Sequence, residues 1–195
     1  MANSGIPVSA ETKAILAKMF LLRKKKVMPA CLFAIRPDKD NDKLNIIEPV
    51  EDSFREHVPK NALAVYKEKY FKKDECCYML YYALIGVSGI QANETPILIH
   101  WCPDACKIKL KMLSASSLHS MKQAASTAEI GGVQTIHFSS LAEVNVNGLS
   151  GLKCIPTGAR VTLLDGMRVK KNKTGYCPED GEEVDDGNEA FCKGR

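Results

Sequence analysis

The sequence predicts an α+β fold, in which helices on both faces sandwich a central mixed β-sheet of about five strands. Apolar segments of strand length alternate with segments whose apolar residues recur at a helical spacing. The central strand segments carry few polar residues, which is typical of strands buried on both faces. Helices are therefore expected to cover both sides of the sheet.

A helix is predicted close to the N-terminus. Ser9 is a suitable N-cap, and apolar residues follow at a helical spacing, at Ile15, Leu16, Met19 and Phe20. The helix should end in a basic cluster, because lysines favour the negative end of a helix dipole. This cluster consists of Arg23, Lys24, Lys25 and Lys26.

Two strand segments follow, at residues 30–35 and 43–47. The polar turn RPDKDND lies between them and predicts a hairpin. Residues 48–61 have the composition of a loop, and residues 62–71 have that of a helix.

A second strand pair is predicted from residues 76–85 and 95–101, which are rich in aromatic and apolar side chains. The segment GVSGIQANE between them is expected to be a loop. His100 and Trp101 should alternate across the last strand, with one of the two side chains facing the core. A further strand is predicted at residues 133–138.

The segment DACKIKLKML, residues 104–113, alternates lysine with apolar residues as a half-buried strand would. However, Pro103 stops the preceding strand and Asp104 is a suitable N-cap, so a helix is favoured. A second, shorter helix is expected at residues 117–125.

As a helix, the segment has two apolar faces. Ile108 and Met112 share one side, while Leu110 and Leu113 lie nearly opposite, with lysines between them. One apolar face could join a core, and the other could meet a partner.

The composition is that of a globular protein with balanced charge. Of the 195 residues, 45% are hydrophobic, and 27 basic and 23 acidic side chains give a formal charge of +4. This balance argues against a dedicated nucleic-acid binder. The eight cysteines, with no signal peptide ahead of them, predict mostly free thiols in a reducing compartment. The apolar runs are too short to span a bilayer.

The chain is expected to divide into a domain at residues 1–144 and an extension at residues 145–195. The extension begins with turn-forming residues and one hairpin-like piece, and it ends in the acidic run EDGEEVDDGNEA. Such an acidic segment is typical of disorder. The extension is therefore predicted to be an appendage, in part disordered, rather than part of the core.

The chain resembles the ADF/cofilin family, whose members carry the actin-depolymerising-factor homology domain. The resemblance rests on SGIPV at residues 4–8, ECCYMLYY at residues 75–82 and WCPDACKIKLKMLSASS at residues 101–117. The third segment is the most specific. It matches the family pattern at Trp101, Pro103, Asp104, Ile108, Lys109, Lys111, Met112, Ala115, Ser116 and Ser117.

The resemblance implies the ADF-homology fold and a protein that binds actin monomers and promotes depolymerisation and turnover of actin filaments. It implies a monomer at the cytoplasmic cytoskeleton, without a cofactor. In this family the lysine stretch is a long helix that enters the cleft of an actin monomer together with the N-terminus. The implied actin-binding residues are Ser4, Gly5, Ile108, Lys109, Lys111 and Met112.

The resemblance also implies regulation. Ser4 matches a serine whose phosphorylation switches off actin binding in the family, which is physically sensible at a surface that meets acidic actin. Lys109, Lys111 and Lys122 are candidates for holding a phosphoinositide. The cluster from Arg23 to Lys26 resembles the family's nuclear-import signal, although a solvated helix end is the plainer interpretation.

Two departures from the family pattern favour binding to monomers over filaments. Filament binders usually carry basic residues in the loop between the central strands, and GVSGIQANE has none. They also end in an amphipathic helix, where this chain has only SSLAEV. The alternative is a relative like coactosin or glia maturation factor, which binds filaments or an actin-related complex without severing.

An enzyme is a further alternative, since eight cysteines could include a thiol nucleophile, but no motif places a histidine beside one. His100, Cys102 and Cys106 have the residue types of metal ligands, but no paired Cys-x-x-Cys accompanies them. We therefore predict neither catalysis nor a metal site.

Overall fold

The structure is a computed structural model that describes residues 6–38, 44–88, 90–157, 159, 161–165 and 167–169. Its elements are α1 (Ala10–Lys24), β1 (Ala30–Pro37), β2 (Asn45–Pro49), α2 (Ala62–Tyr70), β3 (Cys77–Val87), β4 (Ile90–Trp101), α3 (Ile108–Thr127), β5 (Gln134–Phe138), the 3-10 helix η1 (Asn147–Gly151), β6 (Val161–Leu164) and β7 (Met167–Arg168). The predictions for Ser4, Gly5 and the acidic run lie outside the described residues.

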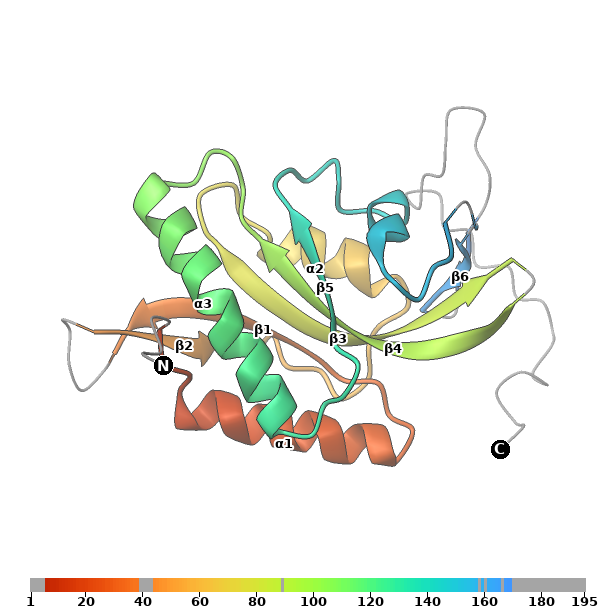
Figure 1. The fold of residues 1–195 in the computed structure, drawn as a ribbon, viewed down its shortest axis with the longest axis horizontal. Coiled ribbons are helices and arrows are strands. Elements are labelled where there is room, and N and C mark those ends of the chain that lie inside the picture. Colours follow the sequence, from red (N-terminus) through yellow and green to blue (C-terminus); the bar gives the residue numbers. More distant parts are fainter. Residues whose placement is uncertain are drawn as a thin grey trace.

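Within the described residues, the strands form one mixed sheet of seven strands, with the order β2-β1-β3-β4-β5 along its main path. Neighbours on this path are antiparallel except β4 and β5, which run parallel. β6 pairs with the far end of β3, and β7 pairs with β6 (Figure 1). The predicted fold class is confirmed.

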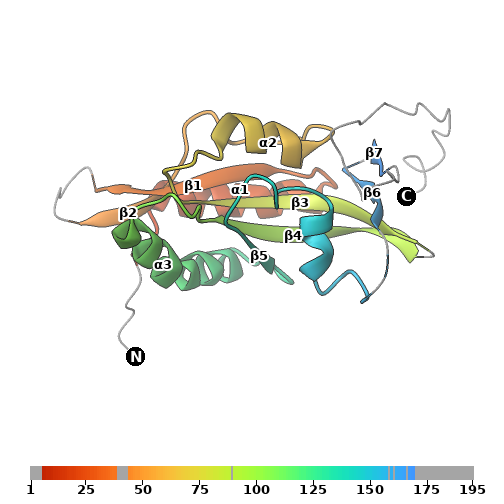
Figure 2. The ribbon, with the colours of Figure 1, turned by 90° about the horizontal axis from the view of Figure 1, so that it is seen from above.

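Each face of the sheet has its own core. Leu16 and Met19 of α1 and Met121 of α3 pack on one face, and Leu63 and Tyr66 of α2 pack on the other. Figure 2 shows α2 and α3 on opposite sides of the sheet. None of the described helices has the length and apolar character needed to cross a membrane.

The expectation that only one of His100 and Trp101 faces the core is wrong. Trp101 is 1% exposed and His100 is 2% exposed, because alternating residues of β4 point into the two separate cores. Trp101 stacks on Phe71, with 5.2 Å between ring centroids, and its indole N–H donates to the Lys72 carbonyl. His100 stacks instead on Tyr78 on the opposite face.

The segment after β4 is helical, as predicted, but its boundaries differ. α3 is one helix of 20 residues rather than two helices, and its N-cap is Lys107 rather than Asp104. A turn intervenes, because the Cys106 N–H donates to the Pro103 carbonyl. The Asp104 N–H donates to the Ser139 carbonyl, which ties this turn to the end of β5.

The prediction of a loop at residues 86–94 is also wrong. β3 and β4 extend almost to Ser88, and they pair from Cys77 and Trp101 at one end to Val87 and Ile90 at the other. The polar residues of this segment therefore belong to a strand that leaves the core. The result is a long hairpin with its tip far from the start of α3 (Figure 1).

The beginning of the C-terminal extension is part of the core, contrary to the expectation of an appendage. Six of its apolar side chains are buried against α2 and the sheet: Val146, Leu149, Leu152, Ile155, Val161 and Leu164. β6 joins the sheet by pairing with Ile85, Gly86 and Val87 of β3. Burial of these side chains removes them from water, which stabilises the fold.

A buried carboxyl lies in the turn after β6. Asp165 is 8% exposed, and its Oδ1 accepts a hydrogen bond from the Leu84 N–H at 3.3 Å. No partner of its Oδ2 is found among the described residues. Burial raises the pKa of Asp165 from its ordinary 3.8 to about 7, and the hydrogen bond from Leu84 only partly opposes this.

We expect Asp165 to make stability fall as pH rises. The folded state keeps the proton up to about pH 7, whereas the unfolded state loses it near pH 3.8. The stabilisation is therefore fully present below pH 3.8 and is lost as pH rises through about 7. Between pH 5 and 8 the loss should be on the order of 2 kcal/mol, measurable by urea unfolding. Asp165→Asn should remove this loss, and an equal pH dependence in both proteins would contradict the assignment.

Candidate functional site

The first turns of α3 carry the most exposed large apolar side chains among the described residues. Ile108 is 76% exposed and Met112 is 68% exposed. They are four residues apart on a helix and so lie on one side of it, one turn after the other. We call this pair the α3 ridge. Exposed apolar side chains grouped in this way are typical of a surface that meets a partner.

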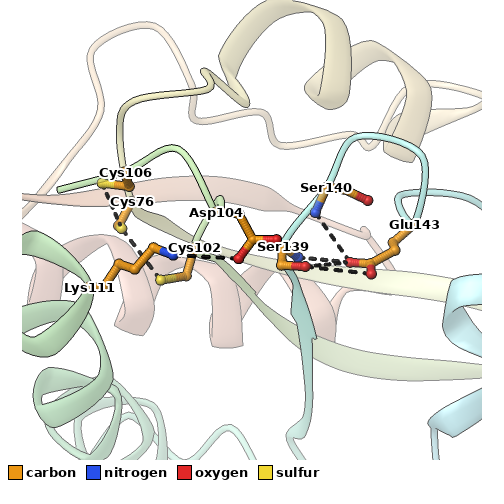
Figure 3. Close-up of polar contacts among 8 residues, drawn as sticks. All are labelled: Cys76, Cys102, Asp104, Cys106, Lys111, Ser139, Ser140 and Glu143. Atoms are coloured by element: carbon orange, nitrogen blue, oxygen red, sulfur yellow. Dashed lines mark hydrogen bonds and ion pairs between the residues drawn. The ribbon is translucent and has the colours of Figure 1, made fainter. Parts of the chain in front are cut away.

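Lysines flank the ridge. Lys109 is exposed, whereas the Lys111 side chain is 31% exposed and its Nζ lies 3.4 Å from Oδ1 of Asp104 (Figure 3). Asp104 itself is highly exposed, so this ion pair contributes little to stability. The carboxylate does, however, compete with any acidic partner for Lys111. Sequence reasoning identified Asp104 only as an N-cap and missed this contact.

The inner face of α3 is made of small side chains. Ser114 and Ser117 are fully buried, and Met121 follows one turn later. The Tyr78 hydroxyl donates to the Ser114 carbonyl at 2.6 Å, and burial raises the pKa of Tyr78 to about 12. The helix is thus held close to the sheet by a protonated phenol. This contact fixes the direction in which the α3 ridge points.

Two histidines extend this contact to the surface. The His100 Nε2 lies 2.5 Å from the Ser114 Oγ, and its Nδ1 lies 2.7 Å from the His137 Nδ1. Burial, together with the smaller effects of the charges of His137 and Lys122, lowers the pKa of His100 to about 4. His100 is therefore neutral at neutral pH. The sequence held no signal for this pairing, because the histidines lie on separate strands.

The first described residues of the chain lie beside the middle of α3. The Ile6 N–H donates to the Ser117 Oγ at 3.3 Å, and Ile6 and Val8 pack against the core beneath α3. Ser9 caps α1 as predicted, since its side chain accepts from the Thr12 N–H at 3.0 Å. Ser4 and Gly5 precede this anchor point and are not among the described residues.

The remaining predicted basic residues are separated from the ridge. Lys122 is exposed but lies three turns beyond Lys111, about 16 Å along the helix axis. At the end of α1, Arg23 pairs with Glu94 at 3.7 Å, and the Lys24 Nζ lies 4.3 Å from the centre of the Phe20 ring. Lys25 and Lys26 are exposed there. The structure therefore brings Lys109 and Lys111 together but not Lys122.

The predicted metal-like residues do not form a common site. His100 is bound to Ser114 and His137, while Cys102 and Cys106 lie near Cys76 (Figure 3). Among the described residues, no group of three or more histidine, cysteine or acidic side chains could hold a metal ion. The described cysteines are free thiols.

Comparisons with known proteins agree on one family. The family model described as cofilin/tropomyosin-type actin-binding protein matches residues 5–150. The cofilin of Eremothecium gossypii is 27% identical over 147 residues, which cover 75% of this chain and 92% of that protein.

Solved structures agree with this fold. The cofilin of Streptomyces griseoflavus has a TM-score of 0.52 at 21% identity, covering 75% of this chain and 98% of that chain. Actin depolymerization factor 2 of Plasmodium berghei has a TM-score of 0.52 at 19% identity, covering 72% and 91%. At these identities the likeness supports the fold alone.

Proposed function

This chain belongs to the family of cofilin/tropomyosin-type actin-binding proteins, and from that premise we propose that it binds actin monomers and promotes the depolymerisation and turnover of actin filaments. The observation that carries the proposal is the α3 ridge. Ile108 and Met112 are large apolar side chains that lie exposed and grouped together, which is typical of a surface that binds a partner. Burial of this ridge against actin supplies affinity. The proposal involves no catalysis and no cofactor.

The charges around the ridge support the same partner. Lys109 and Lys111 flank the apolar pair and would meet acidic groups on actin, which speeds association and fixes orientation. On binding, Lys111 exchanges Asp104 for an acidic group of actin. The serine-lined inner face of α3 keeps this surface rigid, so little ordering is needed when the partner binds.

We propose that monomers are bound in preference to filaments. The resemblance places filament contacts on the tip of the β3–β4 hairpin and on a terminal amphipathic helix. Residues 86–94 include no lysine or arginine, and β6 occupies the edge of β3 next to this tip. Within the described part of the chain, the short 3-10 helix η1 is the only helix that follows β5.

The test is a comparison of monomer binding with filament severing by the full chain. We expect the protein to change the fluorescence of labelled actin monomers at concentrations where it neither severs nor coats single labelled filaments at low salt. Severing at those concentrations would contradict the monomer preference. Filament binding without severing, and without monomer binding, would favour a coactosin-like protein. Binding to neither form would refute the proposal.

A basic segment near the C-terminus is a second candidate for contacting filaments. Arg168, Lys170, Lys171 and Lys173 form a basic cluster in the sequence, although the acidic run after it opposes their charge. If severing is observed, its loss on deletion of residues 170–195 would assign the filament contact to this tail.

We propose that Ser4 is a phosphorylation site that controls monomer binding. The Ile6 N–H donates to the Ser117 Oγ in the middle of α3, and Ser4 is only two residues before Ile6 in the sequence. A phosphate adds about two negative charges, which an acidic partner would repel.

Ser4→Asp is expected to weaken monomer binding several-fold, less than phosphate would, because aspartate carries one negative charge. Ser4→Ala should bind like the wild type, since it adds no charge. Monomer titration of both variants measures the difference. Equal affinity of Ser4→Asp and Ser4→Ala would place residue 4 outside the contact.

Two further roles of the basic residues are proposed. Lys109 and Lys111 form a site for an anionic phosphoinositide headgroup that competes with actin. Lys122 lies about 16 Å farther along α3, so it can contact the same ligand only if that ligand spans this distance. The cluster from Arg23 to Lys26 is proposed as a nuclear-import signal for a protein that otherwise acts at the cytoplasmic cytoskeleton.

A further inference from the structure

Three thiols meet at the end of the sheet where α3 begins. The Cys76 Sγ lies 3.6 Å from the Cys102 Sγ and 3.4 Å from the Cys106 Sγ (Figure 3). Cys76 precedes β3, Cys102 follows β4, and Cys106 lies in the turn before α3. None of these thiols has a role in the proposed actin contact.

The sheet register places two of them directly opposite each other. Cys77 and Trp101 are the last partners in the antiparallel β3–β4 ladder, so Cys76 and Cys102 occupy the positions just beyond its end, opposite each other. Residues paired in this way point to the same face, with Cβ atoms about 4.5–5.5 Å apart. A disulfide needs about 3.5–4.5 Å, so a small movement at the frayed end of the ladder is sufficient.

Cys102 is accessible to a small reagent. It is half-buried and lines a surface groove of about 570 Å³ together with Lys111, His137 and Ser139. The thiolate is the form of a cysteine that reacts with oxidants.

Cys76 is suited to react with Cys102 after Cys102 has been oxidised. Burial raises its pKa, and hydrogen bonds to Cys106 and Cys102 raise it further, so this thiol keeps its proton. Its single S–H can donate to the sulfur of either Cys102 or Cys106. An oxidised Cys102 would then have a thiol within 3.6 Å ready to react with it.

We propose that Cys102 and Cys76 form an oxidation site for hydroperoxides, which closes a disulfide across the open end of the β3–β4 hairpin. The Cys102 thiolate attacks the peroxide, an S–O bond forms as the O–O bond breaks, and an alcohol or water leaves. The Cys76 sulfur then attacks the sulfenic acid, so that an S–S bond forms, the S–O bond breaks and water leaves with the thiol proton. Two thiols are oxidised and one hydroperoxide is reduced.

The test treats the reduced full chain with a small excess of hydrogen peroxide and maps disulfides by peptide mass spectrometry, which separates this bridge from oxidation of other cysteines. We expect a Cys76–Cys102 link that dithiothreitol reverses. The bridge constrains the unfolded chain, so the thermal midpoint should rise by about 6–10 °C.

Three variants assign the roles. Cys102→Ser should form no link, Cys106→Ser should form the same link as the wild type, and Cys76→Ser should leave a sulfenic acid on Cys102 that dimedone labels. Absence of any link in the folded wild type would overturn the proposal. A link from Cys76 to Cys106 in place of Cys102 would overturn it as well. Both results are independent of whether the protein binds actin.

Discussion

Replacing Lys109 and Lys111 together by glutamate is expected to abolish binding to actin monomers while leaving the fold intact. Lys109 is exposed, and the ammonium group of Lys111 pairs with a highly exposed carboxylate, so neither charge is part of the core. The change removes two favourable charge contacts and introduces two repulsive ones beside the ridge. A loss of several kcal/mol follows, which corresponds to about a hundredfold or more in affinity.

A matched control variant distinguishes the effect of losing local contacts from the effect of the changed net charge on monomer binding. Lys73→Glu with Lys153→Glu makes the same change in net charge at two exposed positions outside α3. We expect this control to bind monomers with nearly the affinity of the wild type. Monomer binding by the Lys109 and Lys111 variant at the control's affinity, with a normal thermal transition, would remove this helix face from the interface.

Truncation after Val144 is expected to prevent stable folding. The cut removes six buried apolar side chains from the core around α2, together with β6. At roughly 1.5–3 kcal/mol for each buried side chain, the total loss is as large as the roughly 5–15 kcal/mol that stabilises a typical domain. Truncation after Val169 keeps all six and is the control. The two proteins should differ in thermal unfolding, with a cooperative transition only for the longer one.

The outcome of this truncation also decides the domain boundary. If the fragment of residues 1–144 unfolds cooperatively at the midpoint of the full chain, the boundary expected from composition is the correct one. If only the longer fragment folds, the domain of this chain extends to about Val169, beyond the end of the family match at residue 150.

The sheet and its strands were predictable because their side chains are continuously apolar over the length of a strand. The segments at residues 76–85 and 95–101 are apolar on both faces, and the structure places helices or loops with buried side chains over both. The full length of the β3–β4 pair was missed because the first residues of β4 are exposed and mostly polar, although Ile85 and Val87 of β3 stay buried in the core. Cross-strand pairing, which sequence alone does not reveal, maintains the strands there.

The residue pattern alone predicted two short helices in place of α3, whereas the family resemblance implied one long helix, and the reason is again physical. A helix that packs against a sheet usually shows an apolar stripe, but the inner face of α3 is made of Ser114, Ser117 and Ser120 before Met121 and Ala125. Small side chains let the helix approach the sheet, and buried hydrogen bonds satisfy Ser114. The spacing of these serines is the signal that identifies the buried face.

The candidate site could be predicted only in part. The exposure of Ile108 and Met112 agrees with the outer apolar face expected for a helix at residues 104–113. The contacts of Asp104 with Lys111 and of Ile6 with Ser117 depend on turns and on residues far apart in the sequence. The same holds for the three thiols, whose proximity follows from the sheet register rather than from spacing along the chain.

The central claim is that the α3 ridge is the surface that contacts an actin monomer. Oxidative footprinting tests it directly, because Met112 is highly exposed and a thioether reacts readily when exposed. With saturating actin monomer, we expect oxidation of Met112 to fall several-fold, while oxidation of Leu21, which is 57% exposed on α1, stays unchanged. Unchanged oxidation of Met112 in a complex whose formation is verified in the same sample would contradict the claim.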